Sequence, residues 1–208
     1  MLSPGFIDIH THSDLASFTA PEADSHIYQG VTTDVIGNCG GSAAPMSDFL
    51  KERYKLVATQ YNIKFDWSTF GEYLDKLDSL KTSINLVPLV GQATVRMAAM
   101  GMDNRPPTPR ELELMKKHVA EAMEAGAFGL STGLWYAPSG FAKTDEVIEL
   151  AKVAASYGGI YTSHIRGEGD PLIEAVKEAI EVGDKAKIPV QISHHKAMGM
   201  RNWGKVHE

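Results

Sequence analysis

The sequence predicts an α/β fold with a parallel sheet, and three observations support this. Short apolar runs alternate with longer amphipathic stretches along the 208 residues. The runs are bounded by Gly, Pro or polar residues, as is typical of strands buried on both faces of a parallel sheet. The stretches between them are long enough for helical crossovers.

Six strands are expected, because six short runs rich in apolar and β-branched residues are each flanked by turn-forming residues. They span Phe6–His10, Thr33–Gly37, Ile84–Val90, Ala127–Ser131, Gly159–His164 and Val190–His194. The length of the chain fits one domain over residues 1–208.

Start and stop signals between the strands predict helices. The first helix lies within Trp67–Leu80 and is capped by Ser68 or Thr69. The second opens with Pro109, which suits the first helical turn, and ends before Gly126.

Two further helices and one irregular segment complete the predicted order. Thr144 is the expected N-cap of the third helix, with acidic residues in the turn after it. Pro171 begins the fourth helix, and Gly183 lies near its end. The segment Asn38–Tyr61 is less regular, and we expect a loop with a helical turn over the edge of the sheet.

The composition narrows the classes of function. Twenty basic and 26 acidic side chains give a net charge of -6, which offers no basic surface for nucleic acid or an anionic membrane. No apolar run approaches the ~18 residues of a membrane helix, and the first five residues do not form a secretory signal. The one cysteine, Cys39, excludes a disulfide framework and fits a reducing cytoplasm, where we expect the protein.

Histidines gather at the predicted strand ends. His10 and His12 are two residues apart, so their side chains are expected on one face, where they could bind one metal ion. Two exposed histidines without a ligand are the alternative. His164 and His194 end the fifth and sixth predicted strands. Equivalent positions in three βα units favour a shared site at the carboxyl ends of the strands.

Two further residues are candidates for this site. Cys39 follows the second predicted strand among glycines and is the one soft thiolate available to zinc, although a lone cysteine is more often a small buried hydrophobe. Lys196 follows His194 by two residues and could contact a substrate carboxylate or carbonyl, or leave the strand for solvent. His195 is expected on the opposite face. The remaining histidines are expected at the surface: His26, His118 and His207.

Five motifs run almost from end to end of the chain. They are Pro4–His12, Gly30–Pro45, Gly126–Tyr136, Tyr157–Glu168 and Val190–Lys196. The first resembles the first-strand signature of the metal-dependent amidohydrolase superfamily. The other four resemble, more narrowly, the N-acyl-D-amino-acid deacylases, or D-aminoacylases, in which a cysteine follows the second strand. The resemblance implies a (β/α)8 TIM barrel, of which this chain holds about six βα units.

The resemblance also implies the metal ligands. These are His10 and His12 at one position, and Cys39, His164 and His194 at a tighter zinc position. Many amidohydrolases bridge two ions with a carboxylated lysine on the fourth strand. No lysine stands there in this sequence, and Cys39 is expected in its place, with one or two ions bound. Tyr136 and Lys196 match positions near the substrate.

The implied reaction is hydrolysis of the amide bond of N-acyl-D-amino acids, in which a metal-bound hydroxide attacks the acyl carbonyl. In the family, an aspartate at the end of the eighth strand is the acid and base. We expect that aspartate, the last two strands and a small N-terminal β-domain to lie outside this chain, which would then be a fragment that is inactive alone. Gln92 stands where the family usually carries histidine, and it cannot take a charge.

Two alternatives stay open. A cyclic-amide hydrolase related to dihydroorotase or hydantoinase ranks lower, because those enzymes depend on the absent fourth-strand lysine. The other is a non-catalytic fragment or subunit that another chain completes. A partial barrel leaves two open strand edges, so we expect self-association or a complementing chain.

Overall fold

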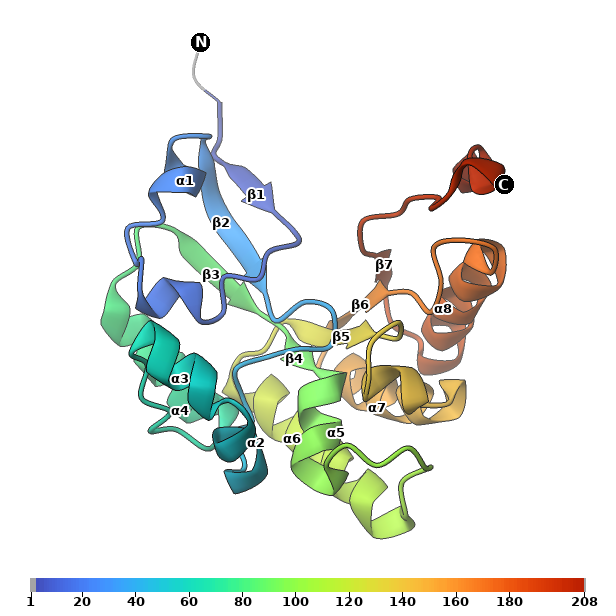
Figure 1. The fold of residues 1–208 in the computed structure, drawn as a ribbon, viewed down its shortest axis with the longest axis horizontal. Coiled ribbons are helices and arrows are strands. Elements are labelled where there is room, and N and C mark those ends of the chain that lie inside the picture. The colour runs from blue at the N-terminus through green and yellow to red at the C-terminus, as the bar shows by residue number, and fades with distance from the viewer. Residues whose placement is uncertain (1–2, 208) are drawn as a thin grey trace.

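The computed structural model describes residues 3–207; residues 1, 2 and 208, at the ends of the predicted domain, lie outside the described residues. Within this range seven strands and eight α-helices alternate, and helices α4 to α8 lie along the outer side of the strands (Figure 1). All strand pairs described are parallel, in the orders β1-β2-β3 and β4-β5-β6-β7. The predicted parallel α/β class is confirmed.

The strands lie close to their predicted positions but are mostly shorter. They are β1 (Phe6–Asp8), β2 (Val31–Ile36), β3 (Asn85–Pro88), β4 (Val90–Gly91), β5 (Gly129–Gly133), β6 (Ile160–His164) and β7 (Val190–Ile192). The ends of the sequence-predicted first and last strands are therefore wrong, because β1 ends before His10 and β7 ends before His194.

The third predicted strand is divided in two, so its prediction as one unbroken strand is wrong. β3 pairs with β2, whereas β4 pairs with β5. The change of partner falls at Pro88, which has no N–H to donate to a ladder. Backbone bonds continue across the division: the Leu89 N–H donates to the Ile36 carbonyl at 2.9 Å, and the Phe128 N–H donates to the Pro88 carbonyl at 2.8 Å. The two sheets therefore form one continuous arc.

The helices confirm most of the start signals. They are α1 (Asp24–Ile27), α2 (Asp48–Arg53), α3 (Lys55–Tyr61), α4 (Phe70–Leu80), α5 (Gln92–Met100), α6 (Pro109–Ala125), α7 (Thr144–Ser156) and α8 (Leu172–Ala186). Thr69 and Thr108 begin α4 and α6 with complete capping boxes, and Pro109 occupies the first turn of α6.

Three helical features differ from the prediction. Thr144 is the first residue of α7 and not its N-cap; its hydroxyl donates instead to Glu178 at 2.9 Å. The segment expected as a loop with one turn contains both α2 and α3. Helix α5 was not predicted, because Gly91 precedes it without a side-chain cap.

The core lies between the arc of strands and the helices. Strand β5 is buried at every position, whereas on β1 Phe6 and Ile7 are each 63% exposed. The first strand is thus an open edge. Among residues 3–207, no helix combines the length and the apolar character that a membrane crossing requires.

Candidate metal centre

One thiol and four imidazoles meet beyond the carboxyl ends of β1, β2, β6 and β7. The Cys39 Sγ lies 3.4 Å from His10 Nε2, 3.6 Å from His164 Nδ1 and 3.9 Å from His194 Nε2. The His12 ring lies edge-on to His10, with 5.3 Å between ring centroids. The structure therefore brings all five predicted ligands together.

The alternation of side chains along a strand does not bring these ligands together. His10 and His12 lie in the turn after β1, where the His10 N–H donates to the Asp8 carboxylate at 3.0 Å. His194 follows β7 with a φ of 36°, in the left-handed region. Turns after the strands, and not the strands themselves, therefore aim these three side chains.

The Cys39 loop is held by strand β5. The Ser131 hydroxyl donates to the Gly37 carbonyl and accepts the Gly40 N–H at 3.1 Å. A Cβ on Gly133 would lie 2.1 Å from the Cys39 carbonyl oxygen, so only glycine permits this close approach. Cys39 itself has a φ of 54°, which turns its side chain out of the β2 direction. The glycines around the cysteine thus serve backbone packing.

Glu168 is a site residue that the sequence reasoning did not single out. Its carboxylate is 4% exposed and its Oε1 lies 2.6 Å from Lys196 Nζ, 2.9 Å from His194 Nδ1 and 3.8 Å from His164 Nε2. When the Nδ1–H of His194 donates to this carboxylate, Nε2 is left as a lone-pair donor facing Cys39. The sequence held one signal for this residue, because Glu168 lies four residues after His164 at the end of the motif Tyr157–Glu168.

The two predicted substrate residues lie beside this cluster. Lys196 Nζ is 3.1 Å from His194 Nδ1, and its side chain remains 52% exposed. The Tyr136 ring lies 4.7 Å from the His164 ring between centroids. His195 is exposed.

His26 departs from the surface expectation. It is half-buried, with its Nδ1 2.9 Å from the buried Asp34 carboxylate. Asp34 also accepts the Ser13 hydroxyl at 3.2 Å. His118, also expected at the surface, is partly buried, and His207 is exposed.

Burial lowers the pKa of His10, His12 and His164 and so favours their neutral forms. Burial, followed by the charges of His194, His12 and His164, lowers the pKa of His10 to about 4. His10 Nδ1 is buried without a hydrogen-bond partner among the described residues. Burial, aided by Glu168 and opposed by Lys196, raises the pKa of the Cys39 thiol to about 11. A cation at this point would reverse the shift, because a coordinated thiol is deprotonated.

The donor set and its spacing fit zinc. Zn–S bonds of ~2.3 Å and Zn–N bonds of ~2.0 Å at tetrahedral angles separate sulfur from nitrogen by about 3.5 Å. The sulfur-to-nitrogen distances of 3.4, 3.6 and 3.9 Å bracket that value. His10, Cys39 and His194 form one group that could hold an ion, and His164, Glu168 and His194 form another.

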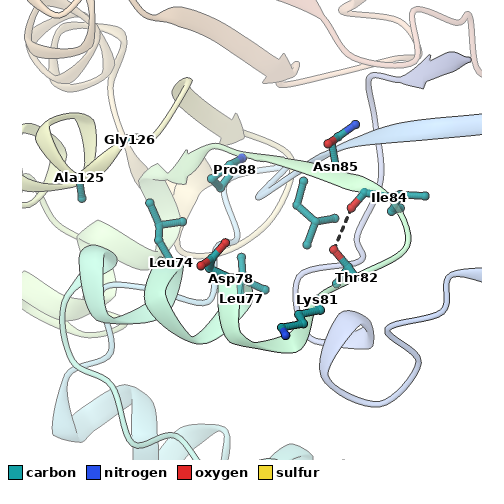
Figure 2. A pocket seen from close by; sticks show the side chains of 11 residues that line it. Leu74, Leu77, Asp78, Lys81, Thr82, Ile84, Asn85, Pro88, Ala125 and Gly126 are labelled. Carbon is teal, nitrogen blue, oxygen red and sulfur yellow. Dashed lines mark hydrogen bonds between the residues drawn. The ribbon is translucent and has the colours of Figure 1, made fainter. Parts of the chain in front are cut away.

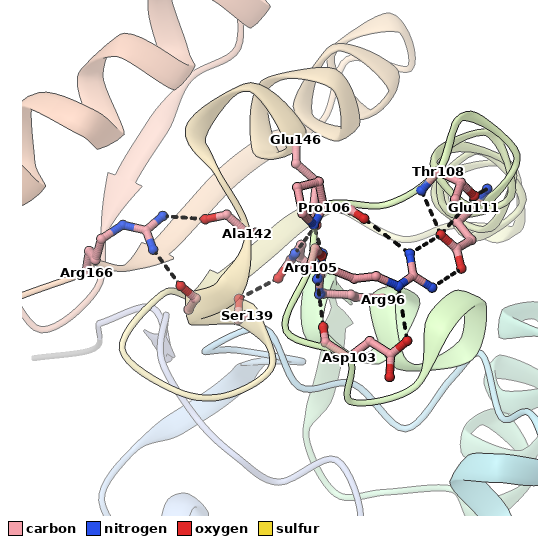
Figure 3. Close-up of polar contacts among 12 residues, drawn as sticks. Arg96, Asp103, Arg105, Pro106, Thr108, Glu111, Ser139, Ala142, Glu146 and Arg166 are labelled. Atoms are coloured by element: carbon pink, nitrogen blue, oxygen red, sulfur yellow. Dashed lines mark hydrogen bonds and ion pairs between the residues drawn. The ribbon is translucent and has the colours of Figure 1, made fainter.

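A second polar cluster is buried away from these ligands. Arg96 Nη1 lies 2.6 Å from Glu146 Oε2 at full burial, and a second guanidinium nitrogen donates to the Asp103 carbonyl at 3.1 Å (Figure 3). The Gln92 amide donates to Glu146 at 3.0 Å and accepts the Ser139 hydroxyl. Gln92 therefore belongs to this structural network.

Two hollows differ in their place relative to the cluster. A hollow of about 570 Å³ lies between α4, β3 and the end of α6, and Figure 2 shows Leu74, Asp78 and Asn85 around it. It lies along β3, from Asn85 to Pro88, and its lining includes none of the predicted ligands. A smaller pocket, of about 230 Å³, includes His12 in its wall.

Comparison with known proteins adds to this geometry. The pattern of the Amidohydrolase family matches residues 1–208. The chain is 38% identical to the D-aminoacylase of Alcaligenes xylosoxydans xylosoxydans over 208 residues, which are 100% of this chain and 43% of that protein. The chain thus spans about two fifths of the length of the relatives it matches.

Two solved structures share the fold. One is a D-aminoacylase studied for the role of its binuclear metal centre, with a TM-score of 0.87, 36% identity, and coverage of 97% of this chain and 42% of that one. The other is an N-acyl-D-glutamate deacylase from Bordetella bronchiseptica, complexed with zinc and a phosphonate mimic of the tetrahedral intermediate. Its TM-score is 0.86 at 38% identity, covering 98% of this chain and 43% of that one. The predicted incomplete barrel is confirmed by this likeness.

Proposed function

Because the chain belongs to the Amidohydrolase family, we propose that it forms the metal-binding portion of a zinc-dependent hydrolase of N-acyl-D-amino acids. One observation carries this proposal: a single thiolate donor, Cys39, lies within 3.9 Å of nitrogen atoms from three histidines on three strand ends. The named deacylases among the relatives support the substrate class. We propose that residues 1–208 form one partial barrel domain.

We propose one or two zinc ions at this centre. The ligands would be His10, His12, Cys39, His164 and His194. Because the Cys39 sulfur lies 3.4 Å from His10 Nε2 and within 3.9 Å of nitrogen atoms of His164 and His194, Cys39 could serve either predicted metal position. When bound, zinc would supply an acidified water and Lewis-acid polarisation of the amide carbonyl.

The remaining side chains would bind and orient. Lys196 donates one N–H to Glu168, and its side chain is half exposed. Its other N–H groups would therefore be free to bind a substrate carboxylate. The Glu168 carboxylate lies 2.9 Å from His194 Nδ1, and by taking the Nδ1–H it would leave Nε2 free to hold an ion. Tyr136, half exposed beside His164, is placed to contact the acyl-amide group.

We further propose that the open edge at β1 pairs with another segment or chain. Phe6, Ile7 and Ile9 are 63%, 63% and 50% exposed, and a strand with an apolar exposed edge is a template for pairing. Sedimentation at several concentrations should show self-association of the chain. A monomer at every concentration would count against it. A free thiol kept for metal binding fits the reducing cytoplasm, where we place the protein.

Metal content and cobalt spectroscopy test the metal-site proposal. The purified chain should hold zinc in at least equimolar amount, and cobalt substitution should give a thiolate charge-transfer band that Cys39→Ser removes. Absence of metal after purification without chelators would overturn the site. For the substrate class, a protein of full family length should hydrolyse N-acetyl-D-amino acids and not cyclic amides such as dihydroorotate.

A further inference from the structure

A small apolar pocket adjoins the metal centre on the side of β1 and β2. Its volume is about 230 Å³, and His12 forms part of its wall. Its apolar lining is Leu15, Ala43, Met46, Tyr54 and Phe65. The polar members besides His12 are Asp14 and Ser42, and the Ser42 hydroxyl is already bonded, since it donates to the Ala44 carbonyl and accepts the Gly91 N–H at 3.0 Å.

The opposite flank of the centre is charged. Lys196 and Glu168 lie against His194, on the side of β6 and β7. The centre therefore has an apolar side next to His12 and a cationic side chain next to His194. An N-acyl amino acid has the same polarity, because its carboxylate and its acyl chain lie on opposite sides of the amide bond.

We propose, on the basis of the proposed function, that this pocket binds the acyl group, and that the site prefers apolar acyl groups of about six carbons to acetyl. The carboxylate then lies toward Lys196 and the acyl chain beyond His12. An apolar cavity of about 150 Å³ is large enough for benzene. A pocket of about 230 Å³ therefore accommodates a six-carbon chain and is poorly filled by a methyl group.

Binding of alkyl hydroxamates to the zinc-loaded chain tests the proposed acyl pocket. The hydroxamate group binds zinc, so the change in affinity with the length of the alkyl chain measures how well that chain fits the pocket. Titration calorimetry would compare acetohydroxamate with the butano-, hexano- and octanohydroxamates. Burial of each methylene should tighten binding by about fourfold. We expect that gain for each methylene up to six carbons, and a smaller gain beyond.

Two matched variants locate the effect. Leu15→Trp fills the pocket, whereas Leu56→Trp makes the same change at a side chain that is 83% exposed on α3. Leu15→Trp should remove the preference for hexanohydroxamate and leave acetohydroxamate binding within about twofold, and Leu56→Trp should change neither. If Leu15→Trp fails to fold, the smaller change Ala43→Val takes its place. It should shift the chain length that binds best to a shorter one.

The outcomes separate this inference from the proposed function. Binding of acetohydroxamate with equal affinity for all chain lengths would overturn the acyl pocket and keep the zinc site. A chain that holds no zinc, and so binds no hydroxamate, would overturn both.

Discussion

The two polar clusters of this molecule differ in their residue types and in how their charges are matched. Around Arg96 a buried guanidinium meets the Glu146 carboxylate at 2.6 Å, and the Gln92 amide donates to the same carboxylate, although Arg96 Nε has no hydrogen-bond partner within the described residues. Around Cys39 the facing groups are all lone-pair donors, and His10 Nδ1 lacks a partner within the described residues. A cluster whose opposite charges are paired stabilises the fold, whereas a cluster of converging donors is suited to a cation.

The difference also separates two kinds of buried polar residue. Removal of one member of a matched pair leaves a buried charge and lowers stability. Removal of one of several converging donors leaves the metal-free fold little changed and weakens the site. Substitutions in each cluster should therefore affect different measurements.

Arg96→Met should have the largest effect. It leaves Glu146 buried without its cation, which should lower the free energy of unfolding by about 3–5 kcal/mol in urea denaturation. Lys76→Met is the control, because it breaks an exposed pair with Asp66 and should change the free energy of unfolding far less than Arg96→Met does. Equal losses in the two variants would contradict the structural role of the buried pair.

Cys39→Ser should weaken zinc binding by more than about 100-fold, because losing a ligand exceeds the usual effect of losing an outer partner. Competition with a chromophoric chelator measures this affinity. The metal-free variant should unfold within about 1 kcal/mol of the parent. Unchanged zinc affinity would show that the sulfur does not bind the metal.

Glu168→Gln should weaken zinc binding by about 10–100-fold, since His194 loses the carboxylate that orients its ring. Glu178→Gln offers a matched control: Glu178 pairs with Arg166 at 2.8 Å, and its contacts lie outside the metal cluster. If both variants bind zinc equally, Glu168 does not orient the ligand.

Gln92→His should have the smallest effect on the site. Gln92 contacts Glu146 and Ser139 and forms no hydrogen bond with a predicted ligand, so zinc affinity should change by less than about twofold. The same chelator competition measures it. A larger change would show that the two clusters are coupled.

Sequence reasoning was most successful where the signal is local. Capping boxes at Thr69 and Thr108 and apolar runs bounded by glycine are written within a few residues, so the alternation of strands and helices could be predicted. The five candidate ligands could be selected because strand ends in a parallel sheet share one edge. Their roles remain predictions.

Long-range contacts were beyond that reasoning. Glu168 is a site residue because it meets Lys196 and His194, which lie 28 and 26 positions later and reach it only after β7 is placed. The change of strand partner at Pro88 and the pocket beside His12 likewise depend on which segments become neighbours. No spacing within the sequence encodes these neighbours.

The hydrogen bonds between Ser131 and the Cys39 loop also set the order in which the ligand cluster can assemble. The loop is fastened by Ser131, which lies 91 residues after Gly40, and the sulfur then meets histidines 125 and 155 residues after Cys39. During synthesis the thiol therefore emerges after His10 and His12 but long before His164 and His194. The nascent chain cannot close the full ligand set around an ion until β5, β6 and β7 have docked, which makes metal capture a late event in biogenesis and ties it to a nearly finished fold.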